Sequence, residues 1–362
     1  MSNKLEKARE IINGVDKKMA ELFVERMRAA ELVYEHKKEH GLPILDEKRE
    51  AELIKSNTAL INDEALKEYY VDFIKSVMSI SRSYQHRMQS GLKVAYSGTE
   101  GAFAHIAAGR IFPDGRRVSY SDFKATYDSV LSGESDVAVL PIENSYAGEV
   151  GQTIDLIFAG ELYINGIYEL DIHQNLLALP MAKIEDIKKV TSHPQALSQC
   201  HEYIKTHGFE TEEANNTALA AKRVALSSDT TLAAIASVET AEIFGLKVLE
   251  SNINKKAENT TRFAVLSKSK AKPADRASSV LMFTVKHEAG CLASAVSIIG
   301  KHGYNMTALR SRPMKKHSWQ YYFYVEIDGS TETESGERML KELSGVCEIL
   351  KVAGSFIPHA EI

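Results

Sequence analysis

The first ninety residues carry apolar side chains at alternating steps of three and four positions, which is the period of an α-helix. Three cations, Arg9, Arg26 and Lys37, lie on or beside this stripe. A cation at a helix interface needs a counter-charge, and the stripe itself offers few acids. The pattern therefore predicts a helical bundle that binds a small polyanion, most simply a dicarboxylate. The apolar stripe of the first segment consists of Leu5, Ala8, Ile12, Val15, Met19, Leu22, Ala29 and Val33.

Polar side chains recur on the next two helical stretches. Asp46, Arg49 and Glu50 share a face with apolar residues, and Ser81 and Gln85 point the same way as the apolar stripe of 66–88. A single arginine near a helix seam usually extends its head into water. Eight polar positions on three helices favour a binding cavity instead.

At this spacing residues 4–90 resemble the all-helical chorismate mutase module. The resemblance is carried by Arg9, Val15-Asp16, Glu25-Arg26, Lys37, Pro43, Asp46, Arg49-Glu50, Ser81 and Gln85. It implies the rearrangement of chorismate to prephenate without a covalent intermediate or a cofactor. The substrate contacts that it implies are Arg9, Arg26, Lys37, Asp46, Arg49, Glu50, Ser81 and Gln85.

The same resemblance assigns a role to each group. Arg26 and Arg49 would hold the two carboxylates, and Lys37 and Gln85 would donate to the ether oxygen as negative charge develops there. The acids Asp46 and Glu50 would orient the hydroxyl end of the substrate. Arg9 would come from the neighbouring subunit of an intertwined homodimer.

A different class of structure is predicted after residue 91. Short apolar runs typical of strands alternate with helical stretches, an α/β pattern. A polar stretch with a proline, 268–278, has the composition of a linker. We expect three domains, at 1–90, 92–268 and 279–358. The predicted strands are 92–96, 137–140, 169–179, 189–191, 231–235 and 262–266, and the predicted helices are 104–111, 123–132, 195–207, 217–226 and 238–244.

Four polar clusters fall at the ends of these strands: 141–145, 192–195, 215–217 and 259–263. Open α/β sheets bind ligands at the carboxyl ends of their strands, and hydroxyl, amide and backbone N–H groups suit an anion. Any one cluster is equally explained by turns and helix caps. Four clusters of one kind favour a binding cleft.

Within residues 92–268 four motifs stand out: Tyr96-x-Gly98-x-x-Gly101-x-Phe103, Pro141-Ile142-Glu143-Asn144-Ser145-x-x-Gly148-x-Val150-x-x-Thr153-x-Asp155-Leu156, His193-Pro194-Gln195 and Thr261-Arg262-Phe263. By these motifs the region resembles prephenate dehydratase, which has two α/β lobes and an active site between them. The resemblance implies loss of water and carbon dioxide from prephenate to give phenylpyruvate, with Thr261, or else Glu143, as the donor to the departing hydroxyl. The substrate contacts that it implies are Asn144, Ser145, Gln195, Thr217, Arg262 and Phe263, with Arg262 either pairing with a carboxylate or bracing its loop.

The pattern of the last region predicts strand, helix, strand, strand, helix and strand, an α+β ferredoxin-like order. The predicted elements are 279–286, 291–302, 305–313, 318–327, 334–343 and 347–352. With Gly290-Cys291-Leu292 at the first helix start and Ser311-Arg312-Pro313 after the second strand, the region resembles the ACT domains that bind phenylalanine as a feedback inhibitor, although Cys291 and Arg310 replace the usual Ala and Glu. The residues implied to bind phenylalanine are Gly290, Cys291, Leu292, Asn305, Ser311, Arg312 and Pro313.

Composition narrows the remaining choices. Lys plus Arg number 44 against 49 Asp plus Glu, a net charge of −5 that does not favour nucleic acid as a partner. Three distant cysteines without a CxxC spacing suit a reducing compartment, and neither a signal peptide nor an apolar run of membrane-spanning length is visible, so a cytoplasmic protein is expected. The pair His36 and His40 lacks a third ligand, so no metal is predicted. The alternative is a cytosolic small-anion sensor with a helical dimerisation arm.

Overall fold

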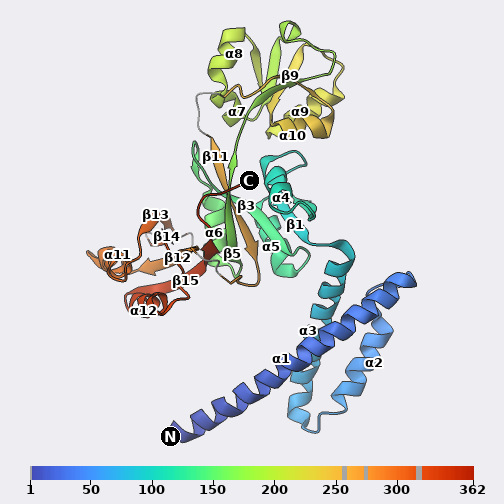
Figure 1. Cartoon of the computed structure of the whole chain (residues 1–362), viewed down its shortest axis with the longest axis vertical. Coiled ribbons are helices and arrows are strands. Elements are labelled where there is room, and N and C mark those ends of the chain that lie inside the picture. Colours follow the sequence, from blue (N-terminus) through green and yellow to red (C-terminus); the bar gives the residue numbers. More distant parts are fainter. Residues whose placement is uncertain (1, 255–258, 273–275, 315–319) are drawn as a thin grey trace. The chain divides into compact units, whose positions relative to one another are not determined.

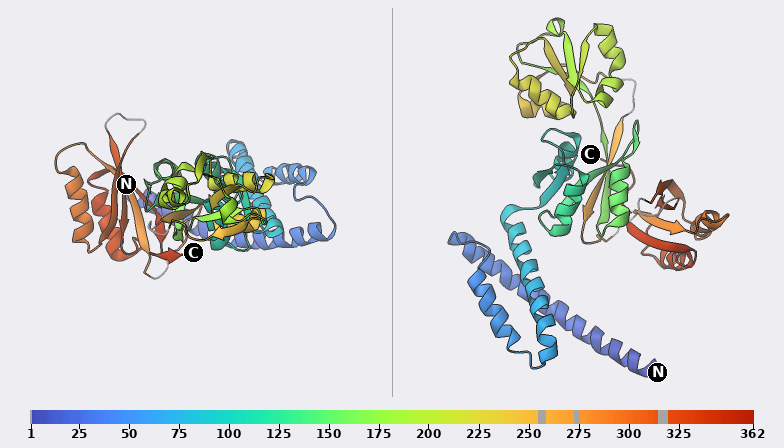
Figure 2. Two further views of the ribbon diagram at one scale, coloured as in Figure 1. Left: turned by 90° about the horizontal axis from the view of Figure 1, so that it is seen from above. Right: turned by 180° about the vertical axis from the view of Figure 1, so that it is seen from behind.

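The computed structural model describes residues 2–254, 259–272, 276–314 and 320–362. Within the chain, two compact units can be separated, 1–91 and 92–362, and each is described here by itself (Figures 1 and 2). None of the helices in the described ranges is both long enough and apolar enough to cross a membrane.

The first unit consists of three helices: α1 (Ser2–Glu39), α2 (Glu47–Thr58) and α3 (Glu64–Ser90). Asp46 caps α2 by accepting the Arg49 N–H at 2.9 Å, and Asp63 caps α3 by accepting the Ala65 N–H at 2.9 Å. On α3 the buried face combines apolar and polar residues: Ile74, Met78, Ser81 and Gln85. Most of the apolar stripe of α1 stays exposed within the chain.

The first lobe of the second unit is a mixed sheet with the strand order β5-β11-β3-β1-β2. The strands β1, β2 and β3 are parallel, and β11 is antiparallel to both β3 and β5. In its core, Leu140, Ile142 and Ile164 are fully buried. The elements are β1 (Lys93–Ser97), α4 (Phe103–Ile111), β2 (Arg116–Tyr120), α5 (Phe123–Ser132), β3 (Val137–Asn144), β4 (Gly148–Glu149), α6 (Gly151–Ala159), β5 (Tyr163–Asp171) and β11 (Thr260–Ser267).

The second lobe has its own sheet, with the strand order β10-β6-β9-β7-β8 (Figure 1). The chain enters this lobe between β5 and β6 and leaves it between β10 and β11, so two segments join the lobes. The elements are β6 (Asn175–Ala178), a 3-10 turn (Ile184–Asp186), β7 (Lys189–Ser192), α7 (Pro194–Gln199), α8 (His201–His207), β8 (Glu210–Glu213), α9 (Thr217–Leu226), β9 (Leu232–Ala236), α10 (Val238–Phe244) and β10 (Lys247–Glu250).

The C-terminal region forms the strand order β13-β14-β12-β15 and continues into the first lobe, because β15 pairs with β5. The contact is made where Gly354 pairs with Ile164. Gly354 has φ +147°, and a Cβ there would collide with the Ile164 carbonyl, so the close approach requires glycine. The elements are β12 (Ser278–Val285), α11 (Cys291–Lys301), β13 (Met306–Pro313), β14 (Tyr321–Ile327), α12 (Glu334–Leu343), β15 (Cys347–Phe356) and β16 (Ala360–Glu361).

Several predicted elements differ from the structure. The expected strand 169–179 is two strands in different sheets, because the chain crosses between lobes at 172–174. The expected helix 195–207 is interrupted at Cys200, which ends α7 and precedes α8. The edge strands β2 and β8 were not predicted, since their residues are mostly polar and exposed. Of the predicted strand 318–327, residues 318 and 319 lie outside the described residues.

Candidate functional site

The three-helix unit contains a cavity of about 280 Å³. Residues from all three helices line it, and seven of the eight predicted mutase contacts are among them: Arg26, Lys37, Asp46, Arg49, Glu50, Ser81 and Gln85. The eighth, Arg9, is exposed on α1 and does not line this cavity. The helical stripe therefore brings these seven predicted side chains together within one chain.

The cations of this cavity have little counter-charge. Arg26 donates to the Ser81 hydroxyl, and burial lowers the pKa of its guanidinium. Lys37 donates to the Ile44 carbonyl. Within the described ranges neither of them forms an ion pair, and the guanidinium of Arg49 pairs with Glu52 at 3.8 Å on the surface. The cavity wall thus carries positive charge that an anion would neutralise.

The other polar groups of this cavity already have some of their hydrogen-bond or ionic partners within the helical unit. Gln85 donates to the Ser81 carbonyl at 3.3 Å, while its buried Oε1 has no partner among the described residues. Asp46 serves as the cap of α2, and Glu50 pairs with Arg82. The sequence interpretation missed Arg82, which also lines the cavity. Its position three residues before Gln85 on one helical face was the available signal.

A second cavity, of about 320 Å³, lies between the two α/β lobes. The predicted residues Asn144, Gln195, Thr217, Thr261 and Phe263 line it. They come from both lobes: β3 and β11 in the first, α7 and α9 in the second. The strand ends and helix starts identified in the sequence therefore meet at one cleft, as expected for an open α/β arrangement.

Asn144 and Thr261 lie at the centre of this cleft. Asn144 Nδ2 donates to Thr261 Oγ1 at 2.9 Å and to Asn259 Oδ1 at 2.7 Å. Gln195 Nε2 reaches Asn144 Oδ1 at 3.4 Å from α7. Thr261 is only 9% exposed, so its hydroxyl lies in a site largely shielded from water.

Asn259 and Gln199 are among the lining residues that were not predicted as site residues. Asn259 donates to Gln199 Oε1 at 3.0 Å, and Gln199 Nε2 is buried without a partner in the described part of the chain. A sequence signal existed for both. Gln199 lies one helical turn after Gln195, and Asn259 lies two residues before Thr261, on the same side of the extended chain.

The predicted residues Glu143 and Arg262 do not line the cleft. Successive side chains of a strand point to opposite faces, so the neighbours of Asn144 and Thr261 face away from the cleft. Arg262 donates to Glu326 through both Nη atoms, at 2.9 and 3.0 Å, and to Glu143 at 3.0 Å. Ser145 also lies outside the lining and pairs with Thr260, whose N–H donates to the Ser145 hydroxyl at 2.9 Å.

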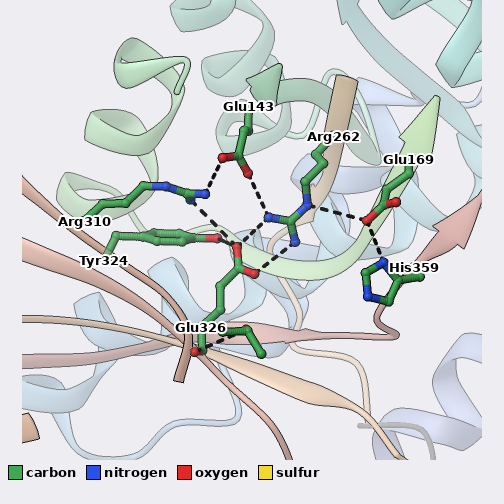
Figure 3. Close-up of polar contacts among 8 residues, drawn as sticks. Glu143, Glu169, Arg262, Arg310, Tyr324, Glu326 and His359 are labelled. Atoms are coloured by element: carbon green, nitrogen blue, oxygen red, sulfur yellow. Dashed lines mark hydrogen bonds and ion pairs between the residues drawn. The ribbon is translucent and has the colours of Figure 1, made fainter. Parts of the chain in front are cut away.

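Figure 3 shows this charge cluster, which joins the first lobe to the C-terminal region. Arg310 of β13 contacts Glu143, and Tyr324 donates to Glu326 at 2.7 Å. Burial alone would lower the pKa of Arg262, but Glu326 and Glu143 outweigh it and raise that pKa. Burial and Glu326 together raise the pKa of Tyr324. The cluster is therefore a compensated set of charges.

Arg312, predicted to bind phenylalanine, lies in a second ionic contact with the first lobe. Its Nε donates to Asp155 Oδ1 at 2.9 Å, and its Nη1 contacts Glu149. Tyr322 donates to the same Asp155 oxygen at 2.6 Å. The hydrogen bond to Asp155 raises the pKa of Arg312. Arg312 thus attaches β13 to α6.

A third cavity, of about 760 Å³, lies in the C-terminal region beside the start of α11. Leu292 and Ser311 line it, together with Tyr321 and Phe323. The other residues predicted to bind phenylalanine do not line it. Gly290 (φ +86°) and Cys291 begin α11, Pro313 ends β13, and Asn305 donates to Asp328 at 3.3 Å. Across the described residues, no group of three or more His, Cys, Asp or Glu is placed to hold a metal ion.

The chain thus contains two cavities lined by predicted site residues, one in a helical unit and one between two α/β lobes. Residues 8–86 match the family of chorismate mutase type II, and residues 94–271 match the prephenate dehydratase family. The bifunctional chorismate mutase/prephenate dehydratase of Aquifex aeolicus is 32% identical over 97% of both chains. This chain belongs to that bifunctional family.

Solved structures resemble the second unit. Prephenate dehydratase from Arthrobacter aurescens, in complex with L-Phe, aligns with a TM-score of 0.68 at 26% identity, covering 74% of this chain and 90% of that one. GqqA, a quorum quenching acylase, aligns with a TM-score of 0.67 at 28% identity, covering 73% of this chain and 97% of that one. The fold of the lobes is thus found in solved proteins.

Proposed function

We propose that this chain catalyses two consecutive steps of phenylalanine biosynthesis. The helical unit rearranges chorismate to prephenate, and the cleft between the lobes converts prephenate to phenylpyruvate. The observation that carries the proposal is that one chain of this bifunctional family holds both a cavity lined by more cations than acids and a polar cleft lined by Thr261.

In the helical unit, the reaction requires a compact substrate conformer and stabilisation of charge. Arg26 and Arg49 bind the two carboxylates, while Lys37 and Gln85 donate to the ether oxygen as the carbon–oxygen bond breaks. Asp46 and Glu50 orient the hydroxyl end. The rearrangement is internal to the substrate, so no cofactor is required.

Arg9 completes this site from a second copy of the chain. The exposed apolar stripe of α1, with Leu5 56% and Leu22 63% exposed, supports such a homodimer. An intertwined pair would cover the stripe and bring Arg9 of one copy to the cavity of the other. We propose that the dimer works in the cytoplasm.

In the cleft, the bond to the ring carboxylate breaks and its electron pair enters the ring, which becomes aromatic. The bond to the ring hydroxyl breaks at the same time, so carbon dioxide and hydroxide leave, and one solvent proton is consumed as the hydroxide becomes water. Thr261 donates a hydrogen bond to the departing oxygen. Asn144 and Gln195 hold the substrate, with Thr217 and Phe263 in the wall. Glu143 and Arg262 brace the C-terminal region instead.

We further propose that the C-terminal region is an ACT domain that binds phenylalanine as a feedback inhibitor. The cavity beside α11, lined by Leu292, Ser311 and Phe323, supports an aromatic ligand. Calorimetry with the full-length chain tests this step: phenylalanine should release or absorb heat and lower the dehydratase rate. Absence of both effects would reject the regulatory role.

The product formed from chorismate tests the main proposal. Purified full-length protein should convert chorismate to phenylpyruvate, with prephenate as a transient species. Accumulation of prephenate would leave only the mutase. Absence of any turnover would favour the alternative, a small-anion sensor with a helical dimerisation arm.

A further inference from the structure

Four polar side chains form a hydrogen-bonded series across the cleft between the lobes, and two of them have no role in the proposal above. Gln199, on α7 of the second lobe, accepts from Asn259 Nδ2 at 3.0 Å. Asn259 Oδ1 accepts from Asn144 Nδ2 at 2.7 Å, and the same nitrogen donates to Thr261 Oγ1 at 2.9 Å. All four residues line the cavity. The series therefore ends at the hydroxyl that acts on the substrate.

The backbone fixes the orientation of the Asn144 amide. Its Oδ1 accepts from the N–H groups of Tyr146 at 3.1 Å and Ala147 at 2.9 Å. An amide accepts only through oxygen and donates only through nitrogen, so Nδ2 must face Asn259 and Thr261. Asn259 must then present its oxygen to Asn144. Its own Nδ2 needs an acceptor on the other side.

Gln199 supplies that acceptor. If the Gln199 amide were rotated by half a turn, its Nε2 would face Asn259 Nδ2, and two donors would oppose each other. An apolar side chain at position 199 would leave Asn259 Nδ2 without this acceptor, so Asn259 would be less firmly held against Asn144. Rotation of Asn259 would in turn oppose Asn144 Nδ2 with a second donor.

The Asn144 amide also affects the hydroxyl of Thr261. A hydroxyl carries one proton, and Thr261 Oγ1 already accepts from Asn144, so its proton remains available for another acceptor. Among the residues that the structure describes, none accepts it. The two backbone N–H groups keep Asn144 from rotating, but without Asn259 its Nδ2 would lose an acceptor and would be held less firmly against Thr261 Oγ1. The position of the Asn144 amide thus decides where the Thr261 hydroxyl points.

We infer that Gln199 and Asn259 are positioning residues for the dehydration step, which hold the Asn144 amide so that Thr261 donates to the departing hydroxyl. This inference rests on the proposed dehydratase function and on Thr261 as its donor. Gln199 belongs to the second lobe and the other three residues lie on the side of the first, so the series also links donor orientation to the approach of the two lobes.

The first test is the kinetics of full-length Gln199→Leu with prephenate. We expect kcat to fall about tenfold or more while KM changes less than about threefold, because an orienting contact acts on the transition state. Gln199→Glu keeps an acceptor for Asn259 and should recover kcat, although its charge raises KM for a dianion. The matched control is Ser198→Ala, on the exposed side of the same helix, which should behave as wild type.

The second test repeats the substitution in a Thr261→Val background. Gln199 acts through the Thr261 hydroxyl, so Gln199→Leu should change kcat less than about twofold there. An equal loss in both backgrounds would overturn the inference, as would wild-type kcat in Gln199→Leu. Asn259→Ala gives an independent variant with the same expected kcat loss should Gln199→Leu fail to fold. Wild-type kcat in Thr261→Val alone would instead reject the donor assigned under the proposed function.

Discussion

Clustered cations occur in two regions of this protein, and the difference between them is the supply of acids. In the helical unit, the hydrogen bonds of Arg26 and Lys37 to described residues go to a hydroxyl and a carbonyl. Where the first lobe meets the C-terminal region, Arg262 and Arg310 share Glu143 and Glu326. The first cluster is left with positive charge facing a cavity, and the second is neutralised within the fold.

This difference separates a binding site from a structural contact. Taking a charge out of water is unfavourable, so a protein that keeps unpaired cations at a cavity loses stability unless an anion binds there. A compensated cluster gains its pairing in the folded state itself. Counting acids around each cation is therefore more informative than counting the cations.

Lys37→Met should have the largest effect. The substitution removes a donor from the ether oxygen and should lower mutase kcat about a thousandfold, since one donor to a developing oxyanion contributes about 3–4 kcal/mol. The melting temperature should not fall, because Lys37 forms no ion pair with a described residue. Steady-state kinetics measures the mutase kcat, and calorimetry measures the melting temperature. The neighbouring exposed Lys38→Met is the control, and a large loss of stability in Lys37→Met would contradict the comparison.

Arg262→Met should behave in the opposite way. It leaves Glu326, whose side chain is 4% exposed, without its bidentate partner. Breaking such a pair costs about 3 kcal/mol, which for a unit of this size lowers Tm by about 6 °C. Mutase activity should be unchanged. Lys124→Met, which removes an exposed pair with Asp128, should cost less than about 0.5 kcal/mol. Equal melting temperatures for wild type and Arg262→Met would show that the cluster is not structural.

Ligand binding should stabilise only the uncompensated region. An unreactive cyclic dicarboxylate at a hundred times its Kd should stabilise the helical unit by about 2.7 kcal/mol. Arg26→Ala should remove most of this stabilisation, since the unpaired guanidinium binds the anion. Calorimetric melting at increasing ligand concentration measures it. If the ligand stabilised Arg26→Ala as much as wild type, the anion would have to bind at another site.

The smallest expected effect is a pH dependence of stability that arises from a buried histidine, His105. His105 Nδ1 accepts the Gly101 N–H at 3.2 Å, and burial, followed by Arg117, lowers the pKa of His105. The unfolded chain therefore binds a proton first, below about pH 6.5, and stability falls as the pH drops from there toward the folded pKa. His105→Gln keeps an acceptor and should flatten this slope. Melting curves between pH 7.5 and 5 test it, and equal slopes would show that His105 is not neutral in the fold.

The helical site was predictable because periodicity alone places side chains on a face. Arg26, Ser81 and Gln85 fell on apolar stripes, and they meet at one cavity. In the cleft the same reasoning was incomplete. Thr261 and Arg262 are adjacent on a strand and cannot share a face, but both faces of β11 are largely buried, so hydrophobicity did not reveal which side formed the cleft.

The contacts of the C-terminal region were beyond sequence reasoning. Arg312 meets Asp155 across a separation of 157 residues, and Arg310 meets Glu143 across 167. No local period relates such pairs. A charge on a strand is equally compatible with an effector, a substrate or another strand, and only the fold selects among them.

The central claim is that two independent sites on one chain act in sequence, and the most direct measurement is product analysis of two variants supplied with chorismate. Thr261→Val should accumulate prephenate, because the helical cavity is intact. Arg26→Ala should leave chorismate unchanged, yet convert supplied prephenate to phenylpyruvate at the wild-type rate. Loss of both reactions in either variant would contradict the account.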